Sequence, residues 1–450
     1  MKTAVLKSKE GFRSQLSRAW KLSVPAILTQ FSTIAMQYID SAMVGNLGAN
    51  ASAAIGLVST STWLMGGVIG AVSVGFSVQV AQYIGAEEPQ NARRVIKHGL
   101  VTSLIASTII GLLGVVVSSS LPRWLGGEEA LWKDAGAYFL VFAVTLPFIG
   151  LNGMASAFLQ SSGNMVVPSV LNSLMCVLDV LFNAFFVPRY GVLGAAIGTG
   201  LAYATVCFLE LWICCFRYEP LRLNRKEKCP LDISILRRAL KIGTPVGVES
   251  IAISGAYVAS TMIIAPLGAV SIAAHSFAIT AESICYMPGF GVARAASILV
   301  GQSIGARDYH LARRYAYITV IFGSAMMALT GIIMYIICPF VFGLLTPVVE
   351  VQRVATQILR IGLIAEPLFG VSMVASGALQ GAEDTLVPSI LNLLSIWGVR
   401  LTLAMILVPI YGIHGMWVAM AVELCVRGLL LLTRLIRSKY LKPVANKEKS

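Results

Sequence analysis

The segment QYIGAEEPQNARR at residues 82–94 recurs as QSIGARDYHLARR at residues 302–314, at an offset of 220 and with seven of thirteen positions identical. A second pair keeps the same offset: LQSSGNMVVPSVLN at residues 159–172 and LQGAEDTLVPSILN at residues 379–392. Self-similarity at one fixed offset indicates an internal duplication. We therefore expect the two halves of the chain to share one fold.

The composition excludes most classes of soluble protein. Of the 450 residues, 57% are hydrophobic and 12% are charged, and the mean hydropathy is +0.79. Soluble domains have roughly 45–50% apolar and about 25% charged residues, so this chain has too few charges to cover a surface in water. A soluble enzyme, a disordered chain and a nucleic-acid binder are therefore poor interpretations. We predict an integral membrane protein whose partners are the lipid bilayer and small molecules, not nucleic acid.

Twelve apolar stretches are long enough to cross the membrane, since a spanning helix needs about 20 residues. Without water to pair with backbone groups, such segments form helices. The predicted helices cover residues 22–44, 51–76, 95–120, 135–158, 166–188, 191–216, 240–265, 270–299, 315–343, 354–378, 386–409 and 412–433. If the N-terminus is cytoplasmic, the cytoplasmic segments contain 26 of the 34 Lys and Arg residues. The positive-inside rule therefore places both termini in the cytoplasm.

The offset of 220 superimposes the first six predicted helices on the last six. Because six is even, both repeats start on the same side of the membrane and the repeat is parallel. The predicted fold class is an all-α integral membrane protein made of two parallel six-helix repeats. The predicted parts are a cytoplasmic N-terminal segment, an N-lobe, a cytoplasmic linker, a C-lobe and a cytoplasmic tail, at 1–21, 22–216, 217–239, 240–433 and 434–450. Secondary transporters with such repeats hold their binding site between the lobes and alternate access.

Acidic residues inside the predicted helices are the first candidates for function, because a charge at bilayer depth costs about 2.5–3.5 kcal/mol. Two polar faces arise from residues at helical spacing, one in the first helix and one in the fifth: Gln30, Thr33, Gln37 and Asp40, and Asn172, Asp179 and Asn183. Because each face contains one Asp, the pattern predicts a site for a proton or Na⁺. The alternative is hydrogen bonding that only holds the helices together.

The C-lobe contains a second group of candidates: Glu249, His275, Glu282, Arg294 and Arg400. His275 and Glu282 are seven residues apart and share a helix face. The PGFG run at 288–291 is expected to interrupt the eighth helix, and interrupted helices often line transport sites. The alternative is a kinked packing helix in which Glu282 pairs with Arg294 or Arg400. Glu423 and Arg427, at i and i+4, are expected to form a local ion pair.

Four Met and aromatic residues are candidates for lining a substrate cavity: Met36, Tyr38, Met287 and Phe290. Such side chains adapt to large amphipathic cations through polarisable sulfur and ring faces. Packing within the protein or against lipid is the alternative for each.

Motifs for enzymatic chemistry do not support an enzyme. The dipeptide Gly-Lys never occurs, so the chain has no Walker A loop, and no HExxH surrounds any of the four His. We predict no enzymatic activity, no cofactor and no metal, apart from a possible Na⁺ at Asp40 and Asp179. A channel is also disfavoured, because a parallel two-lobe chain without a filter-like segment suits alternating access better.

Four strings together resemble the multidrug and toxic-compound extrusion (MATE) family: YIDSAMVGNLG at 38–48, PLGAVSIAAH at 266–275, and the later YMPGFG and VGQSIGA. The resemblance extends over about residues 18–435. It implies a V-shaped pair of six-helix bundles that exports organic cations and other amphipathic compounds in exchange for H⁺ or Na⁺.

The resemblance also implies roles for individual residues. Asp40 matches the acid of the family's first helix. Asp179 matches the fifth-helix acid of one prokaryotic branch, and Thr199 the sixth-helix Thr that joins it, whereas Glu249 and Glu282 fall near second-lobe acids of other members.

One position departs from that branch, which usually has Asn four residues before the fifth-helix acid. Here that residue is Met175. Because Met offers no oxygen for Na⁺, the departure favours H⁺, although Asn172 or Asn183 could substitute as a ligand.

The sequence therefore predicts a secondary active multidrug efflux antiporter in the inner (plasma) membrane. It would export amphipathic or cationic organic compounds in exchange for H⁺ or Na⁺ by alternating access, and we expect a monomer. The alternative is a lipid-linked oligosaccharide flippase of related architecture, which should have extra helices and a basic central cavity. A membrane scaffold without transport would be insensitive to Asp40→Asn.

Overall fold

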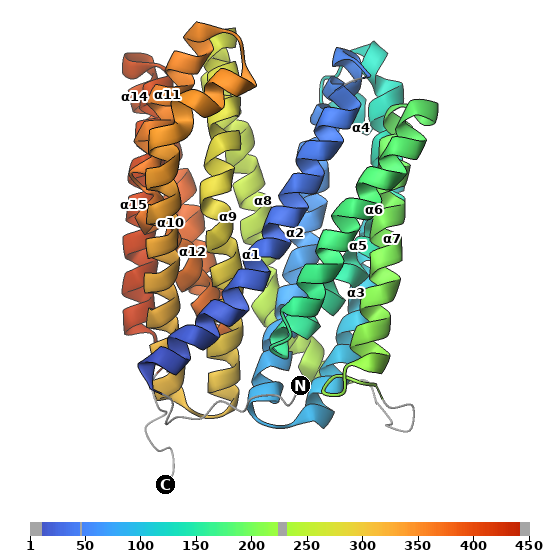
Figure 1. Ribbon diagram of the computed structural model, residues 1–450, viewed down its shortest axis with the longest axis vertical. Helices are drawn as coiled ribbons and strands as arrows, with labels where there is room; N and C mark the ends of the chain where they lie inside the picture. Colours follow the sequence, from blue (N-terminus) through green and yellow to red (C-terminus); the bar gives the residue numbers. More distant parts are fainter. Residues whose placement is uncertain (1–10, 46, 224–231, 442–450) are drawn as a thin grey trace. The chain divides into compact units, whose positions relative to one another are not determined.

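The computed structural model describes residues 11–45, 47–223 and 232–441, and within these ranges every regular element is a helix. The first half contains α1 (Phe12–Gly45), α2 (Ala49–Gly85), α3 (Pro89–Val117), α4 (Leu121–Trp124), α5 (Glu129–Ser161), α6 (Val166–Tyr190), α7 (Val192–Trp212) and the π-helix η1 (Ile213–Arg217) (Figure 1). The second half contains α8 (Ile233–Ile264), η2 (Ala265–Leu267), α9 (Ala269–Gly305), α10 (Tyr309–Leu345), α11 (Val349–Leu363), α12 (Glu366–Gly381), α13 (Leu386–Leu394), the π-helix η3 (Ser395–Leu401), α14 (Thr402–Tyr411), α15 (Ile413–Arg437) and η4 (Lys439–Leu441). The predicted all-α fold class is confirmed.

The backbone repeats with the sequence. α2 and α9 begin at Ala49 and Ala269 and both contain 37 residues, so their bounds differ by the same offset of 220. The turns that follow them share a left-handed residue, Glu87 with φ 59° and Arg307 with φ 57°. A left-handed non-glycine residue is uncommon, so its recurrence at equivalent positions shows that the two copies fold alike.

Ten described helices are long and apolar enough to cross a membrane, and α11 with α12 forms an eleventh span that bends by 53°. The twelfth predicted span, residues 22–44, lies inside α1, which is helical but does not belong to this set. Its polar face lowers its hydropathy: Gln30, Thr33, Gln37 and Asp40. The predicted helix at residues 22–44 is therefore present, and the polar face of the candidate site explains why it is less apolar than the other spans.

The predicted interruption of the eighth span is wrong. α9 runs without a break from Ala269 to Gly305 and contains Pro288. The glycine-rich run serves close packing, since a Cβ on Gly291 would lie only 2.7 Å from the backbone nitrogen of Ile27. The irregular backbone occurs later, at the bend between α11 and α12 and in the π-helix η3.

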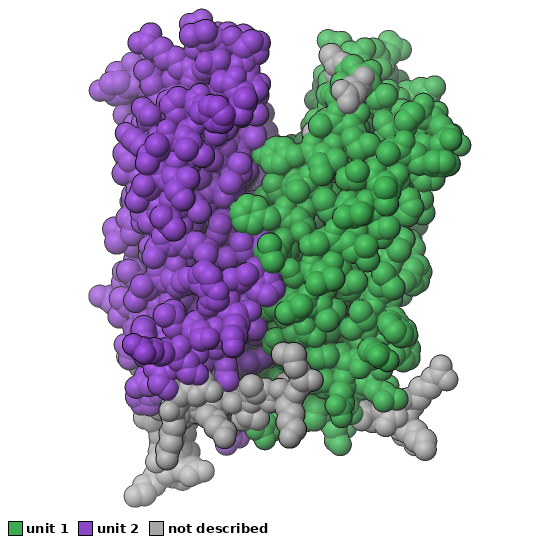
Figure 2. All heavy atoms as spheres, in the orientation of Figure 1, with its two compact units in different colours: residues 1–5, 28–250 green, residues 6–27, 251–450 purple. Residues whose placement is uncertain are grey.

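The chain packs as two compact units, shown in separate colours in Figure 2. In the described ranges, unit 1 contains residues 28–250, and unit 2 contains residues 11–27 and 251–441. The lobes expected at 22–216 and 240–433 follow from membrane topology, and they stay a prediction.

Both unit boundaries lie within helices, so α1 and α8 each contribute to two packed cores. In unit 2, the first part of α1 packs on α9, where Ile27 meets Gly291. In unit 1, the first part of α8 packs on α2, where a Cβ on Gly247 would lie 3.5 Å from the Cβ of Ala71. Residues 27 and 291 correspond to 247 and 71 by the offset of 220, so the duplicated helices pack through equivalent positions.

Candidate functional site

Helices α1, α6 and α7 bring four predicted residues together in unit 1. The Asn183 amide donates a hydrogen bond to Asp40 Oδ1 at 2.6 Å, and the Thr199 hydroxyl donates to Asp40 Oδ2 at 3.4 Å. Asp179 stands one turn before Asn183 on α6, and its carboxyl faces that of Asp40. The cluster therefore joins two carboxyl groups and two neutral donors from three helices.

Asp179 is fully enclosed within this cluster. Its side chain is 0% exposed, and neither carboxyl oxygen has a hydrogen-bond partner of standard geometry among the described residues. No Lys or Arg in the described ranges acts on either carboxyl. Two ionised carboxylates placed in this way would repel each other without compensation. The arrangement is therefore suited to bind a proton or a small cation.

Two glycines set the approach of α7 to its neighbours. A Cβ on Gly198 would overlap the Asn183 amide oxygen and lie 3.1 Å from the Asn183 backbone nitrogen. A Cβ on Gly200 would lie 2.8 Å from the hydroxyl of Thr145 on α5. The sequence Gly198-Thr199-Gly200 thus lets the Thr hydroxyl reach Asp40 while α7 packs closely on both sides.

Two tyrosines near the acid pair are not predicted by the sequence. Tyr138 on α5 and Tyr203 on α7 lie within electrostatic range of both Asp40 and Asp179. A phenol can donate a hydrogen bond to a carboxylate. Both residues stand in apolar stretches, where an aromatic side chain is more often a packing residue, so only three-dimensional proximity marks them.

The remaining predictions in unit 1 fall outside the cluster. Asn172 donates to a backbone carbonyl four residues before it at 2.8 Å, and Gln37 is exposed. Met36 is buried in an apolar cluster that includes Met175, so packing describes its environment. Tyr38, by contrast, is 42% exposed.

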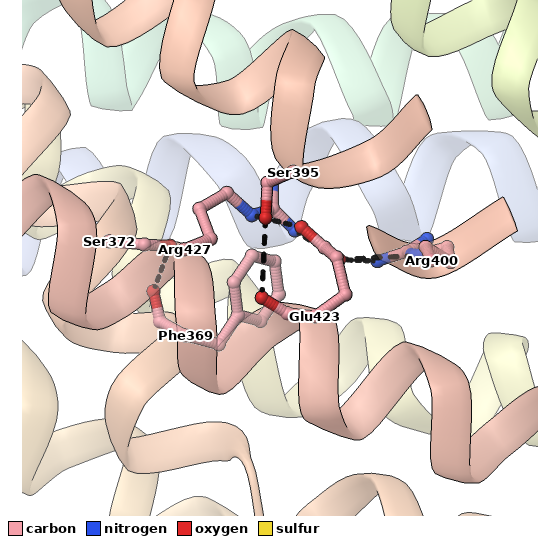
Figure 3. A network of polar contacts seen from close by, with 6 residues as sticks. All are labelled: Phe369, Ser372, Ser395, Arg400, Glu423 and Arg427. Carbon is pink, nitrogen blue, oxygen red and sulfur yellow. Dashed lines mark hydrogen bonds and ion pairs between the residues drawn. The ribbon is translucent and has the colours of Figure 1, made fainter. Parts of the chain in front are cut away.

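Unit 2 contains a buried ion-pair network, drawn in Figure 3. Arg400 donates to Glu423 Oε2 from Nε at 3.1 Å and from Nη2 at 2.6 Å. Arg427 Nε pairs with Glu423 Oε1 at 2.9 Å, the local ion pair expected from their i, i+4 spacing. The Ser395 hydroxyl donates to the Glu423 carbonyl at 3.4 Å. The carboxylate of Glu423 is thus shared by two guanidinium groups. Its ion pair with Arg400, on η3, is not predicted by the sequence.

Glu282 does not form the ion pair with Arg294 or Arg400 that its packing alternative predicts. It is buried on α9, its Oε1 has no hydrogen-bond partner in the described ranges, and Arg400 acts on it only electrostatically. Glu366, the first residue of α12, is fully buried, and both of its oxygens lack a described partner. Its carboxyl lies within electrostatic range of Glu282.

The other C-lobe candidates lie in different surroundings. The Trp417 indole donates to His275 Nδ1 at 3.1 Å, and because an indole can only donate, this Nδ1 has no proton. Glu249 lies on the part of α8 that belongs to unit 1, so it is not in the same unit as His275 and Glu282. Met287 is buried in unit 2.

Phe290 and Arg294 are one helical turn apart on α9, and both are exposed. Phe290 is 43% exposed, and its ring meets that of Tyr286 with centroids 6.0 Å apart. No described residue forms a hydrogen bond or ion pair with the Arg294 guanidinium.

A duplicated all-helical membrane protein with buried, unpaired carboxyl groups has the construction of an ion-coupled transporter. The MatE family model matches residues 25–185 and again residues 245–406, more than half of the chain. The chain therefore belongs to the MATE family of multidrug efflux transporters. This is a family of transporters, not of enzymes, and its members couple transport to an ion.

Relatives and solved structures agree with this assignment. The probable multidrug resistance protein NorM of Bacillus anthracis is 24% identical over 448 residues, which cover 97% of this chain and 98% of the relative. The multidrug resistance protein NorM of Burkholderia vietnamiensis is 28% identical over 91% of this chain and 88% of the relative. A mutant of the Vibrio cholerae MATE transporter VcmN superimposes with a TM-score of 0.89 at 19% identity, covering 95% of this chain and 98% of that one. The protein is thus a multi-pass, bacterial NorM-like protein of the plasma membrane.

Proposed function

We propose that this chain is a proton-coupled antiporter that exports amphipathic organic compounds, with Asp40 and Asp179 as its coupling site. The supporting observation is the pair itself: Asp40 accepts hydrogen bonds from Asn183 and Thr199 beside a fully buried Asp179 that has no described cationic neighbour. Such a pair accommodates one negative charge together with one proton. Both acids come from unit 1, so a single chain is sufficient.

A proton fits this site better than Na⁺. Each oxygen of Asp40 already faces a donor, at 2.6 Å from Asn183 and 3.4 Å from Thr199. Residue 175, which could have supplied a further oxygen ligand, is a methionine buried among apolar side chains. The side-chain amide nitrogen of Asn172 donates a hydrogen bond to a backbone carbonyl of its own helix. A sodium ion needs several oxygen ligands, whereas a proton needs one carboxylate oxygen.

Antiport follows if the proton and the substrate cannot both be bound in the same access state. When Asp40 is ionised, its charge attracts a cationic substrate from the cytoplasm. Protonation removes that charge and favours release to the outside, and loss of the proton to the cytoplasm resets the carrier. The coupling requires only that the two ligands differ in affinity for the two access states.

Glu282 is our proposal for a second proton-binding group, in unit 2. Around it, Arg400 and Arg427 contribute two positive charges, of which Glu423 balances one. The unpaired carboxyls of Glu282 and Glu366 add two more acids. The net charge of these two arginines and three glutamates is zero when one glutamate is protonated. Because Arg400 acts electrostatically on Glu282, Glu282 is the acid best placed to gain or lose that proton.

Proteoliposomes test both sites with ethidium as the substrate, under an imposed pH gradient and then an imposed Na⁺ gradient. We expect the pH gradient alone to drive transport, Asp40→Asn to abolish it, and Glu282→Gln to change its dependence on pH. Asp134→Asn, an exposed acid at the start of α5, is the matched control and should behave as wild type.

Three outcomes would contradict the proposal. Transport driven by Na⁺ alone would replace the proton by Na⁺, and full activity of Asp40→Asn would remove the acid pair from the mechanism. No transport of ethidium under either gradient, by protein that remains folded, would favour the flippase and a lipid-linked substrate.

A further inference from the structure

Unit 1 contains another buried carboxyl, away from the acid pair. Glu210 lies on α7 and is 0% exposed, and neither of its carboxyl oxygens has a hydrogen-bond partner of standard geometry among the described residues. No Lys or Arg of the described part of the chain acts on it. Cys207 and Cys214 lie within its electrostatic range, but their thiols supply no positive charge. Because an ionised carboxylate would lack compensation here, Glu210 is suited to hold a proton.

The fold does not require a carboxyl at this position. α7 begins at Val192 and its copy α15 begins at Ile413, so the offset between the two helices is 221. Glu210 therefore corresponds to Leu431, which is 1% exposed and lies in an apolar core of unit 2. A leucine of similar size thus fills the equivalent place in the other copy. Packing explains the leucine, whereas a buried acid without a cationic partner points to a role for its proton.

Polar side chains connect Glu210 with one end of α5. The Ser156 hydroxyl faces the Glu210 carboxyl. The Gln160 amide donates a hydrogen bond to the Ser156 hydroxyl oxygen at 3.2 Å, and a hydroxyl that accepts in this way can donate to the carboxyl. Ser156 is buried, whereas Gln160 is partly exposed and stands one residue before the end of α5. The positive-inside rule places this end of α5 in the cytoplasm, so the polar row leads from Glu210 to the cytoplasmic surface.

In the opposite direction, α7 leads from Glu210 to the acid pair. Thr199, Tyr203 and Glu210 are spaced by four and seven residues and therefore lie on one side of the helix. Thr199 donates to Asp40, and Tyr203 lies within electrostatic range of both acids of the pair. At 1.5 Å per residue, Glu210 lies about 16 Å along α7 from Thr199, toward the cytoplasm. Glu210 thus stands between the coupling site and the cytoplasm.

We propose that Glu210 is a proton-transfer residue, which accepts the proton that the acid pair loses toward the cytoplasm and releases it to water at the end of α5. In each transfer an O–H bond breaks on one oxygen and forms on the next, so no oxidant or reductant is needed. The proposal rests on the proposed proton coupling and adds a residue to it. Asp40 remains the coupling residue, and Ser156 and Gln160 position the Glu210 carboxyl.

Two transport assays in proteoliposomes separate proton transfer from substrate handling. Net uptake of ethidium under an imposed pH gradient requires protons to cross the protein. Exchange of radiolabelled for unlabelled ethidium without a gradient requires no net movement of protons. Both rates, and thermal unfolding in detergent, are measured for wild type, Glu210→Gln, Glu210→Asp and Glu210→Leu. Glu219→Gln, an exposed acid after η1, is the matched control and should behave as wild type.

We expect Glu210→Gln and Glu210→Leu to slow net uptake at least about tenfold, because a positioned acid–base group contributes about 10²–10⁴-fold to a proton transfer. Exchange should stay within about twofold of wild type, since Asp40 keeps its hydrogen bonds. Glu210→Asp should recover part of the net uptake, because it keeps a carboxyl. Glu210→Leu should keep the melting temperature, because Leu431 packs in the equivalent place.

Equal losses of net uptake and exchange in Glu210→Gln would overturn the proposal, because they would indicate a structural role. Net uptake at the wild-type rate in Glu210→Gln or Glu210→Leu would overturn it as well. Failure of the proposed proton coupling gives a different result. Wild type itself would then show no uptake under the pH gradient, and the role of Glu210 would fall with it.

Discussion

Gly198→Ala should impair coupling without touching a charged residue. The added Cβ would overlap the Asn183 amide oxygen and lie 3.1 Å from the Asn183 backbone nitrogen, which cannot move as a side chain can. Asn183 must therefore turn away, and its 2.6 Å hydrogen bond to Asp40 is lost. A hydrogen bond to a charged group contributes about 1.5–3 kcal/mol. At tenfold per 1.4 kcal/mol, proton-driven transport should fall about 10- to 100-fold.

The assay is uptake of ethidium by proteoliposomes under a pH gradient, with thermal unfolding in detergent measured on the same preparations. The substitution also overpacks the contact of α6 with α7, which should cost about 1–3 kcal/mol of stability. Gly153→Ala on α5 is the control, because a Cβ there meets nothing within 4 Å. It should leave transport unchanged and stability equal or slightly higher, since Ala favours a helix over Gly.

A double-mutant cycle shows whether Gly198 acts through Asn183. Asn183→Ala removes the hydrogen bond directly, and in that background the overlap with the amide oxygen no longer exists. Adding Gly198→Ala should then reduce transport little further, because the two substitutions remove the same interaction. An equally large additional loss in the Asn183→Ala background would refute the reasoning.

Two further predictions concern stability. Glu423→Gln should lower the free energy of unfolding by about 3 kcal/mol or more, because it leaves the guanidinium groups of Arg400 and Arg427 without the carboxylate they share. Arg400→Met should cost less, because Glu423 keeps Arg427 as its partner, and an equal loss of melting temperature in the two variants would contradict the charge argument. Asp232 accepts hydrogen bonds from the Ser234 backbone and hydroxyl at 2.9 and 2.6 Å at the start of α8, and these bonds lower the pKa of the Asp232 carboxyl. Because the pKa of Asp232 is lower in the folded state, its ionised carboxylate stabilises the fold at any pH above the ordinary Asp pKa of about 3.9. This stabilisation is lost as the pH falls through the lowered pKa. Asp232→Asn should therefore reduce the melting temperature at pH 7 but not in strong acid.

The fold could be predicted from the sequence because its determinants are local or repeated. Long apolar segments must form helices in lipid, and a fixed offset forces two copies of one fold. The exceptions have local physical causes. Residues 22–44 are helical yet less apolar, because they display the polar face with Asp40. Pro288 does not break α9, because neighbours pack tightly against the adjoining glycines and hold the helix together.

The residues of the candidate site could be predicted where their spacing along a single helix places them on one face. Asp40, Asp179 and Asn183 stand out because polar residues in an apolar helix are costly and share a face. Tyr138 and Tyr203 could not be found in this way, since their proximity to the acids depends on the packing of α5 and α7.

The ion-pair network in unit 2 was harder to predict, because the alignment between the two copies shifts by one residue near it. The offset between the copies is 220 at Asn172 and Asn392 but 221 at Val187 and Val408. The second copy therefore contains one extra residue between these points, and the π-helix η3 at Ser395–Leu401 lies there. A single wide turn absorbs one residue without breaking the helix, and such turns are frequent at functional sites.

The extra residue changes what the duplicated helix presents. With the offset of 221 that holds beyond η3, Asn183 corresponds to Ala404, whereas Asp179 falls on η3 itself, the element that contains Arg400. The stretch that carries Asp179 and Asn183 in one copy thus carries Arg400 and Ala404 in the other, although the surrounding helices are equivalent. A fold made of two copies would give two similar sites if the residues had stayed alike. Because they did not, unit 1 keeps two acids with no described cationic partner, whereas the buried acids of unit 2 lie with Arg400 and Arg427. This difference in charge is the physical basis for placing the principal coupling site in unit 1, where no described arginine compensates the two acids.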